Sequence, residues 1–232
     1  MISVKEFYFN PLQEHTVIAY GEDKIAVIVD PGMSNPSECS RVADFVSANG
    51  LQLKAILLTH GHFDHIYGVK WCVDSYGVPV YMNPADSVIV ENAPKHASAF
   101  GLDEPQIDFS TKDIADGDIL SFGEMSFEVV STPGHTPGGV CYIDKGNSFM
   151  FSGDTLFAGT IGRSDLPGGD YDSLILSLMN KLMFLDGDME VFPGHGGNTT
   201  IGDERTQNPF LQPFNEKDPE TGSVDGISYL ED

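Results

Sequence analysis

The segment from Thr59 to His65, with the sequence THGHFDH, holds three histidines and one aspartate. Imidazole nitrogens and carboxylate oxygens are common ligands of transition metals, so this density favours a metal-ligand cluster over a charged, solvent-exposed loop. His60 and His62 alternate across a glycine and can both face one ion. Asp64 and His65 turn toward a second position, so this one segment can supply ligands to two metal ions.

Three further candidate ligands each follow a glycine at the end of a predicted strand: His135, Asp154 and His195. A glycine at such a position lets the backbone come close to an ion, because no side chain intervenes. The same local arrangement occurs in three places, which strengthens the prediction of a metal site.

The candidate set offers nitrogen and oxygen ligands and no thiolate, which suits two ions with an open position for water better than a closed structural zinc site. If Asp154 bridges the ions, each ion has a complete set of protein ligands. Metal binding lowers the pKa of water from about 16 to about 7 and so supplies a hydroxide, shared between the ions, near neutral pH. The same ions polarise a carbonyl and stabilise the oxyanion formed by attack. The expected chemistry is hydrolysis of an ester-like bond.

The elements around the histidine segment form a predicted β-α-β unit. Lys54 to Leu58 (KAILL) is an apolar run typical of a buried strand, Ile66 to Tyr76 has a helical pattern, and Val78 to Met82 is a short strand. The histidines therefore lie at the carboxyl end of a strand, where α/β proteins commonly build open sites.

The first thirty residues predict an antiparallel meander of three strands, Ile2 to Asn10, Thr16 to Tyr20 and Lys24 to Asp30. Asp30 precedes Pro-Gly, and ordinary turn chemistry is favoured over a role near the metal loop. His15 is interpreted as a strand residue only. Asn35 to Glu38 begins a helix that Asn49-Gly50 ends.

Residues Pro84 to Gly101 predict two helical pieces, broken at Asn92 to Pro94, that could border a substrate cleft. His96 is interpreted as a surface helix residue. Further strands are predicted at Ile119 to Phe122, Met125 to Ser131, Val140 to Asp144, Ser148 to Phe151 and Glu190 to Phe192. The glycine-rich segment Gly159 to Asp170 is predicted to be a tight connector. A helix is predicted from Ser173 to Phe184, with Asp170 or Asp172 as its N-terminal cap.

Length, charge and cysteine content narrow the functional classes. The 232 residues are compatible with one large domain, assigned to 1–214, followed by an acidic tail over 215–232. A net charge of −23, from 12 basic and 35 acidic residues, argues against nucleic acid and anionic membranes as partners. Three scattered cysteines make no disulfide framework, and no signal peptide or membrane span is recognised, so a cytoplasmic protein is expected. The oligomeric state stays open.

Four motifs in order, HxHxDH, PGHTPG, SGDTLF and PGHG, span residues 59 to 197 and resemble the metallo-β-lactamase fold, in particular glyoxalase II (hydroxyacylglutathione hydrolase) and its short bacterial relatives. GRSDLPGGD at Gly162 to Asp170 and ERTQNPF at Glu204 to Phe210 extend the resemblance. It implies an α/β (α+β) four-layer αβ/βα sandwich of two mixed β-sheets flanked by helices. It also implies hydrolysis of a small-molecule thioester such as S-lactoylglutathione.

Transferred residue by residue, the resemblance implies two divalent metal ions per chain. The first would be bound by His60, His62 and His135, the second by Asp64, His65 and His195, and Asp154 would bridge them. Zinc is the first expectation, with iron or manganese as alternatives.

Other functions in the same fold stay open. A lactonase-like hydrolase is one, and a non-catalytic metal-binding module is another. A persulfide dioxygenase would use a single iron at His60, His135 and Asp154, although the intact PGHG around His195 resembles the hydrolases better. No cysteine stands near Asp154, which counts against lactam hydrolysis.

The segment after His195 departs from the longer glyoxalase II enzymes, which carry a C-terminal helical domain with basic residues for glutathione. Here 37 residues follow His195, with Arg205 and Lys217 as their only basic residues. The substrate is therefore less well defined than the reaction type.

Overall fold

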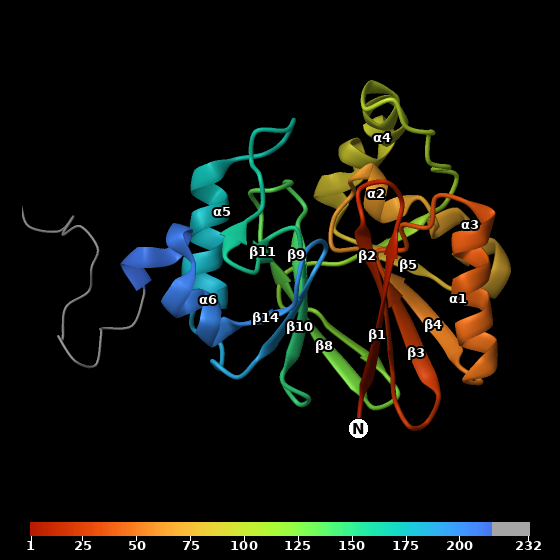
Figure 1. The fold of residues 1–232 in the computed structure, drawn as a ribbon, viewed down its shortest axis with the longest axis horizontal. Helices are drawn as coiled ribbons and strands as arrows, with labels where there is room; N and C mark the ends of the chain where they lie inside the picture. The colour runs from red at the N-terminus through yellow and green to blue at the C-terminus, as the bar shows by residue number, and fades with distance from the viewer. Residues whose placement is uncertain (215–232) are drawn as a thin grey trace, which may run out of the picture.

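The computed structural model describes residues 1–214, which form two six-stranded sheets and a small two-stranded ribbon (Figure 1). The first sheet has the strand order β1-β2-β3-β4-β5-β6. Its strands are β1 (Ser3–Phe9), β2 (Glu14–Tyr20), β3 (Ile25–Val29), β4 (Gln52–Leu57), β5 (Val80–Met82) and β6 (Thr111–Asp113). The first three strands pair antiparallel, as the meander prediction required, and β3 to β6 pair parallel. The sheet is therefore mixed.

The second sheet has the order β14-β13-β10-β9-β8-β7 and is also mixed, because only β10 and β13 pair parallel. Its strands are β7 (Ile119–Phe122), β8 (Met125–Ser131), β9 (Val140–Asp144), β10 (Phe149–Gly153), β13 (Glu190–Pro193) and β14 (Thr199–Thr200). The ribbon pairs β11 (Leu156–Phe157) with β12 (Thr160–Ile161).

Helices cover the outer faces of both sheets. The helices are α1 (Pro36–Ala48), α2 (Phe63–Ile66), α3 (Val69–Tyr76), α4 (Ser87–Ala99), α5 (Tyr171–Ser177) and α6 (Ile201–Gln207). Figure 1 shows α1 and α3 outside the first sheet, and α5 and α6 outside the second. The order of layers is helix, sheet, sheet, helix, so the predicted four-layer αβ/βα sandwich is confirmed.

The alternation of side chains along the strands explains why each sheet buries both faces. In β3, Ala26 and Ile28 belong to the core shared with the helices of the first half, whereas Val27 and Val29 belong to the core between the sheets. Successive side chains of a strand point to opposite faces, and both faces here are apolar. A third core lies between the second sheet and its helices, where Leu174 of α5 and Ile201 of α6 are fully buried.

Several predicted boundaries were wrong. The helix expected over Ile66 to Tyr76 is two helices, α2 and α3, and β5 begins at Val80 rather than Val78. The helix expected from Ser173 begins at Tyr171, capped by Asp170, and ends at Ser177; a π-helical turn, Leu178–Leu182, follows it. The strand predicted to end at Phe151 continues to Gly153.

The predicted break in the fourth helix is also wrong. A short 3-10 turn, Pro84–Asp86, leads into α4, and α4 then runs through Pro94 without interruption. Proline removes one helical hydrogen bond, but Ala93 and Ala97 beside it are buried against the core. Packing of this face therefore keeps the helix continuous. Among the residues that the structure describes, no helix is long and apolar enough to cross a membrane.

Candidate metal centre

One triad of histidines forms where the two sheets meet. His60 and His62 lie between β4 and α2, and His135 lies between β8 and β9. Their ligand-type nitrogens all lie within 4.8 Å of one another, and Nδ1 of His62 is 2.9 Å from Nε2 of His135. Nε2 of His60 is buried and has no hydrogen-bond partner within residues 1–214. These nitrogens converge on one point, as ligands of a common ion would.

A second triad lies next to the first. Asp64 and His65 come from α2, and His195 follows β13. Their ligand-type atoms also lie within 4.8 Å of one another. Nε2 of His195 is 3.3 Å from Nε2 of His65 and 3.2 Å from Oδ2 of Asp64. The structure therefore separates the histidines and aspartates into two groups that can each hold an ion.

Asp154 stands between the two triads. Its Oδ1 lies 3.5 Å from Nε2 of His65, and its Oδ2 lies 3.4 Å from Nε2 of His135. Oδ1 is buried and finds no hydrogen-bond partner in the described part of the chain. One carboxylate thus presents an oxygen to each triad, and all the candidate ligands named from the sequence come together at one site.

Metal ligands must be neutral imidazoles and ionised carboxylates, and His60, His62 and Asp64 fit this requirement. Burial, and then the neighbouring His135, lowers the pKa of His62 to about 3. Burial together with the surrounding histidines also lowers the pKa of His60 well below its usual value. Burial raises the pKa of Asp64, but His65 and His195 outweigh it and keep the carboxyl below its usual range. In the metal-free protein burial lowers the pKa of His65 and of His195, but the neighbouring carboxylates of Asp154 and Asp64 outweigh it and raise both, so an ion at the second triad would have to displace protons from these rings. The unpartnered atoms and the facing nitrogens therefore fit a pair of bound cations.

Asp30 holds the histidine segment in place. Its Oδ1 accepts a hydrogen bond from the Thr59 amide at 2.7 Å, and its Oδ2 accepts one from the Thr59 hydroxyl at 2.5 Å. The same Oδ2 lies 3.0 Å from Nδ1 of His65. Although Asp30 also lies within 4.8 Å of His60 and His65, both of its oxygens are already engaged, so its role is to orient ligands. Its interpretation as ordinary turn chemistry was wrong.

Asp86 joins the two loops that carry the histidine triad, and sequence reasoning did not single it out. Its side chain is fully buried. Oδ2 accepts hydrogen bonds from the Gly61 amide at 2.8 Å and the Thr136 hydroxyl at 2.8 Å, and Oδ1 accepts one from the Gly138 amide at 2.6 Å. The only local signal is an aspartate at the start of a predicted helix, which is far too common to be diagnostic.

The remaining histidines are oriented through their second ring nitrogen. Nδ1 of His135 lies 2.7 Å from the Arg163 carbonyl, and Nδ1 of His195 lies 3.2 Å from the Leu12 carbonyl. If each Nδ1 carries the proton and donates it, Nε2 is left with its lone pair toward the cluster. Such partners are what metal-binding histidines need.

Close packing at Gly194 explains why a glycine precedes His195. A side chain at this position would collide with the Asp154 carboxylate and with the His65 ring. The glycine before Asp154 has a different reason, because Gly153 adopts a φ of 49°, in the left-handed region. The expectation that a glycine permits a close approach to the ligands therefore holds for Gly194, whereas Gly153 lies against the Thr59 side chain and Gly134 against the backbone of Leu174.

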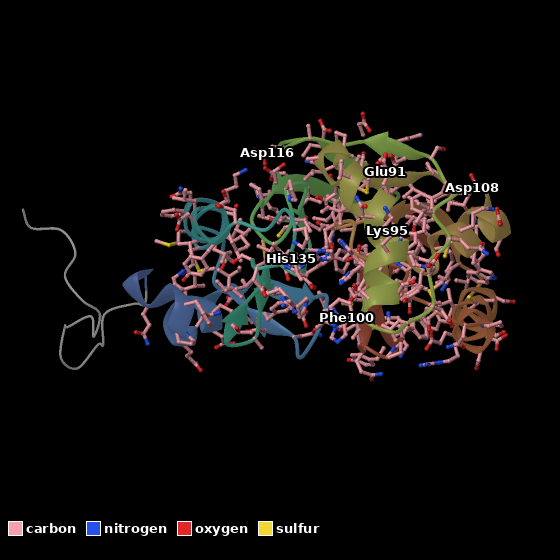
Figure 2. The ribbon with its side chains drawn as sticks, turned by 90° about the horizontal axis from the view of Figure 1, so that it is seen from above. Glu91, Lys95, Phe100, Asp108, Asp116 and His135 are labelled. Atoms are coloured by element: carbon pink, nitrogen blue, oxygen red, sulfur yellow. The ribbon has the colours of Figure 1, made fainter. Side chains whose placement is uncertain are left out.

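A cleft of about 560 Å³ opens above the cluster. One wall comes from α2 and α4 and includes Phe63, His96 and Phe100; the other comes from the ribbon and includes Phe157 and Ile161. Figure 2 views this side from above, with Phe100 at the end of α4 and His135 between α4 and the helices of the second half. His96 lies half-buried on the surface of α4, as predicted, and it also lines the cleft, which was not foreseen. The expectation that this insertion borders a cleft is confirmed.

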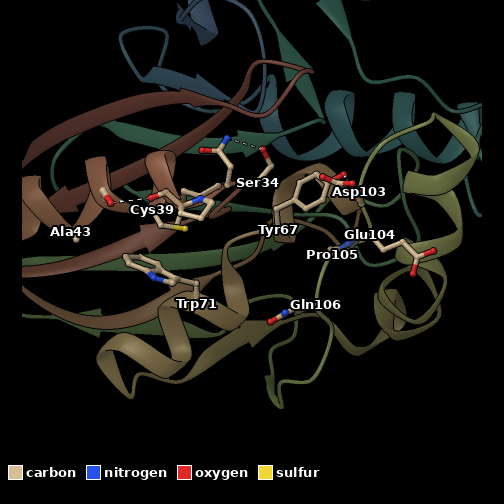
Figure 3. A pocket seen from close by; sticks show the side chains of 13 residues that line it. Ser34, Cys39, Ala43, Tyr67, Trp71, Asp103, Glu104, Pro105 and Gln106 are labelled. Carbon is tan, nitrogen blue, oxygen red and sulfur yellow. Dashed lines mark hydrogen bonds between the residues drawn. The ribbon is translucent and has the colours of Figure 1, made fainter.

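A second pocket, of about 450 Å³, lies beside α1 and α3 and contains none of the candidate ligands (Figure 3). Cys39, Trp71 and Glu104 are among its lining residues. Tyr67 closes one side, and its hydroxyl donates a hydrogen bond to the Asp103 carbonyl at 2.7 Å. The chemistry therefore belongs to the cleft above the histidines.

Two facing mixed sheets with a histidine and aspartate cluster at their common edge define a metal-binding αβ/βα sandwich. Residues 10–195 match the family model of the Metallo-beta-lactamase superfamily, and the chain belongs to this superfamily. Membership supports a metal-dependent hydrolase.

Individual relatives cover nearly the whole chain. The protein is 39% identical over 203 residues to hydroxyacylglutathione hydrolase GloC of Haemophilus influenzae. The aligned residues make up 86% of this chain and 93% of that relative. A crystal structure of TTHA1623 in a di-iron-bound form is 38% identical, with a TM-score of 0.81, covering 89% of this chain and 100% of the other. The crystal structure of BLEG-1 B3 metallo-beta-lactamase is 35% identical, with a TM-score of 0.81, and the match covers 90% of this chain and 99% of the other.

Proposed function

We propose that this protein hydrolyses small-molecule thioesters, with S-lactoylglutathione as the reference substrate, and that it does so with two divalent metal ions. The observation that carries the proposal is the position of Asp154. Its Oδ1 lies 3.5 Å from Nε2 of His65, and its Oδ2 lies between the triads, 3.4 Å from Nε2 of His135 and 3.8 Å from Nε2 of His195. A single-metal site, such as that of a persulfide dioxygenase, would leave the triad of Asp64, His65 and His195 unused.

The ligand assignment follows the two triads. His60, His62 and His135 would hold one ion, Asp64, His65 and His195 the other, and Asp154 both. Nitrogen and oxygen donors of this kind suit zinc, iron and manganese. Zinc is the first choice because it needs no particular redox state, and the di-iron form of the similar TTHA1623 supports iron as the alternative.

The bound ions would supply a water nucleophile near neutral pH and polarise the substrate carbonyl. Asp30, Asp86 and the carbonyls of Leu12 and Arg163 keep the ligands oriented, so little rearrangement is needed during the reaction. The apolar walls of the cleft reduce the amount of water next to the cluster when a substrate is bound, which would strengthen electrostatic interactions there.

The leaving group favours a thioester over an amide. A free thiol has a pKa of about 8.5, so a thiolate departs without being protonated first. Among the described residues, the cleft lining supplies no carboxylic acid apart from Asp64 and Asp154, and both belong to the proposed ligand set; the imidazole of His96 on α4 also lines the cleft. A substrate whose leaving group needs no general acid does not depend on His96 for proton transfer and suits this site.

The test is turnover of S-lactoylglutathione by protein loaded with two equivalents of zinc or iron, followed as release of free thiol. We expect activity that disappears with chelator and returns when metal is added. Absence of thiol release with either metal, from S-lactoylglutathione and from a hexanoyl thioester alike, would overturn the proposal. Oxygen consumption with a glutathione persulfide, by protein holding one iron per chain, would show the dioxygenase instead.

Lactam hydrolysis is the second candidate, favoured by the 35% identity to the BLEG-1 B3 metallo-beta-lactamase. This similarity weakens the argument drawn from the missing cysteine near Asp154. A chromogenic cephalosporin assayed beside the thioester separates the two functions. A lactone substrate in the same series tests the lactonase-like alternative.

A further inference from the structure

Apolar side chains form most of the cleft outside the proposed ligands. Leu12, Phe63, Ala99 and Phe100 lie on one side, and the ribbon and the loop after it add Phe157, Ile161, Leu166 and Pro167. The polar exceptions are His96, Thr160 and Arg163. A small hydroxyacyl group gains little from such walls, whereas an apolar group would bury surface on both sides of the site.

The charge of the cleft contrasts with that of the protein. The chain has 35 acidic residues against 12 basic ones, yet the lining contains no carboxylate besides Asp64 and Asp154 among the described residues. Among the described residues, Arg163 is the only arginine or lysine in the lining, and its guanidinium pairs with Asp165 through two contacts of 2.7 Å in an exposed ion pair. The cleft therefore offers a charged thiol carrier a single cation, which Asp165 partly compensates.

Two large apolar side chains of the lining are left partly in water. Phe100 is 56% exposed and Leu12 is 40% exposed. The Phe100 ring contacts the Phe63 ring, with centroids 5.7 Å apart. Because Asp64 directly follows Phe63 in the chain, this aromatic surface runs from the rim of the cleft to the proposed ligands. Exposed apolar surface that adjoins a reactive cluster indicates a binding surface for an apolar ligand group.

We infer that the preferred substrates are thioesters with a bulky apolar acyl group, such as a medium aliphatic chain or an aryl group, rather than small hydroxyacyl thioesters. This inference rests on the proposed function. The carbonyl would lie at the metal cluster while the acyl group lies along the apolar wall that ends at Phe100. Specificity thus comes from the acyl half of the substrate, and Phe100 is a specificity-determining residue.

Binding and turnover test the inference separately. In binding, S-hexylglutathione, a thioether that cannot be hydrolysed, is compared with S-methylglutathione by calorimetry on the metal-loaded protein. We expect the hexyl compound to bind at least tenfold more tightly. In turnover, kcat/KM is measured for acetyl, lactoyl, hexanoyl and benzoyl thioesters of one thiol, and we expect hexanoyl to exceed acetyl and lactoyl by about tenfold or more.

Matched variants locate the effect. Phe100→Ala should reduce the preference for hexanoyl over acetyl at least threefold, whereas Phe184→Ala should leave it unchanged. Phe184 is 76% exposed and is not part of the cleft lining, so it is a control of the same residue type. Equal affinity for the hexyl and methyl thioethers, or a higher kcat/KM for lactoyl than for hexanoyl, would overturn the inference. Tight hexyl binding without hydrolysis of any thioester would instead overturn the proposed function.

Discussion

Oδ2 of Asp30 lies 3.0 Å from Nδ1 of His65, and this contact joins the end of β3 to the helix that carries two proposed ligands. Burial lowers the pKa of His65, but Asp154, Asp64 and Asp30 outweigh it and raise the pKa well above its usual value. The bond also fixes which ring nitrogen faces Asp154 and His195. A carboxylate behind a ligating histidine keeps the ring oriented and more basic.

Replacing Asp30 should therefore weaken metal binding. The carboxylate of Asp30 accepts hydrogen bonds from the amide and the hydroxyl of Thr59 and lies against Nδ1 of His65. The side chain of Asp30→Asn has one oxygen acceptor and an NH2 donor, so it cannot make all three contacts. We expect metal affinity to fall roughly 10- to 100-fold. Competition with a coloured chelator measures this, and Asp44→Asn, at an exposed position on α1, is the control. Equal affinities of the variant and the control would contradict the orienting role.

Asp86→Asn should destabilise the fold as well as the site. The wild-type carboxylate accepts hydrogen bonds from Gly61, Thr136 and Gly138. In the variant the side-chain NH2 group, itself a donor, would face at least one of these donors in a fully buried position. Such a mismatch costs about 1–3 kcal/mol, which corresponds to a fall in Tm of about 2–12 °C for a domain of this size. Thermal unfolding of the variant and of Asp44→Asn would show this; equal Tm values would refute it.

The proposed ligands could be found from the sequence because their signals are local. His60, His62 and His65 lie within six positions, and His135 and Asp154 each follow a glycine at a strand end. Such spacing directly reflects the geometry of a loop at the edge of a sheet. The same strands were predicted with small boundary errors, since an apolar run marks a strand that is buried on both faces.

The orienting residues could not be found because their partners are distant. Asp30 contacts residues 29 and 35 positions further on, and Asp86 contacts residues 25 positions before it and 50 after it. A buried carboxylate that joins two loops has the same local sequence as one that only caps a turn. The cleft position of His96 was missed for a similar reason, because it depends on how α4 packs across the site. The short strands β6 and β14 have too few residues to show any alternation.

Asp154→Ala tests the bridging assignment. Because this carboxylate faces both triads, its removal should lower the metal content from two ions toward one or none and abolish hydrolysis. Metal analysis after gel filtration and a thiol-release assay measure the two effects together. Retention of both ions with full turnover would show that another group bridges them.

His15 should make the stability of the metal-free protein dependent on pH. Burial, and then the proximity of His195, lowers its pKa to about 4, against about 6.5 in an unfolded chain. Between these values the unfolded chain holds the proton and the folded chain does not, so stability falls as the pH falls from about 6.5 to about 4. The slope from this residue is at most about 1.4 kcal/mol per pH unit.

His15→Gln removes the titrating group and should flatten this part of the stability curve. Urea unfolding at several pH values in the presence of chelator gives the free energy of unfolding of the variant and of the wild type. The contributions of the other histidines cancel in the difference between the two. At pH 7 we expect the metal-loaded variant to keep activity within about threefold, which is under about 1 kcal/mol in the barrier. An unchanged slope would mean that His15 titrates normally in the folded protein.

The last prediction concerns the thiol carrier. Residues 215–232, which lie outside the described part of the chain, contain six acidic residues and one lysine, a composition unsuited to binding the carboxylates of glutathione. Arg205 offers no clamp either, because its Nε and Nη2 donate to the carbonyls of Met183 and Leu185. With little binding energy available from the carrier, its identity should have a small effect on the transition state. We therefore expect a high KM for S-lactoylglutathione and comparable kcat/KM for lactoyl thioesters of smaller thiols. Deleting residues 215–232 should spare kcat and either leave or lower KM for anionic thioesters, measured against the full chain at the same metal loading. A preference of a hundredfold or more for the glutathione thioester, lost on deletion, would show that the tail takes part in binding the carrier.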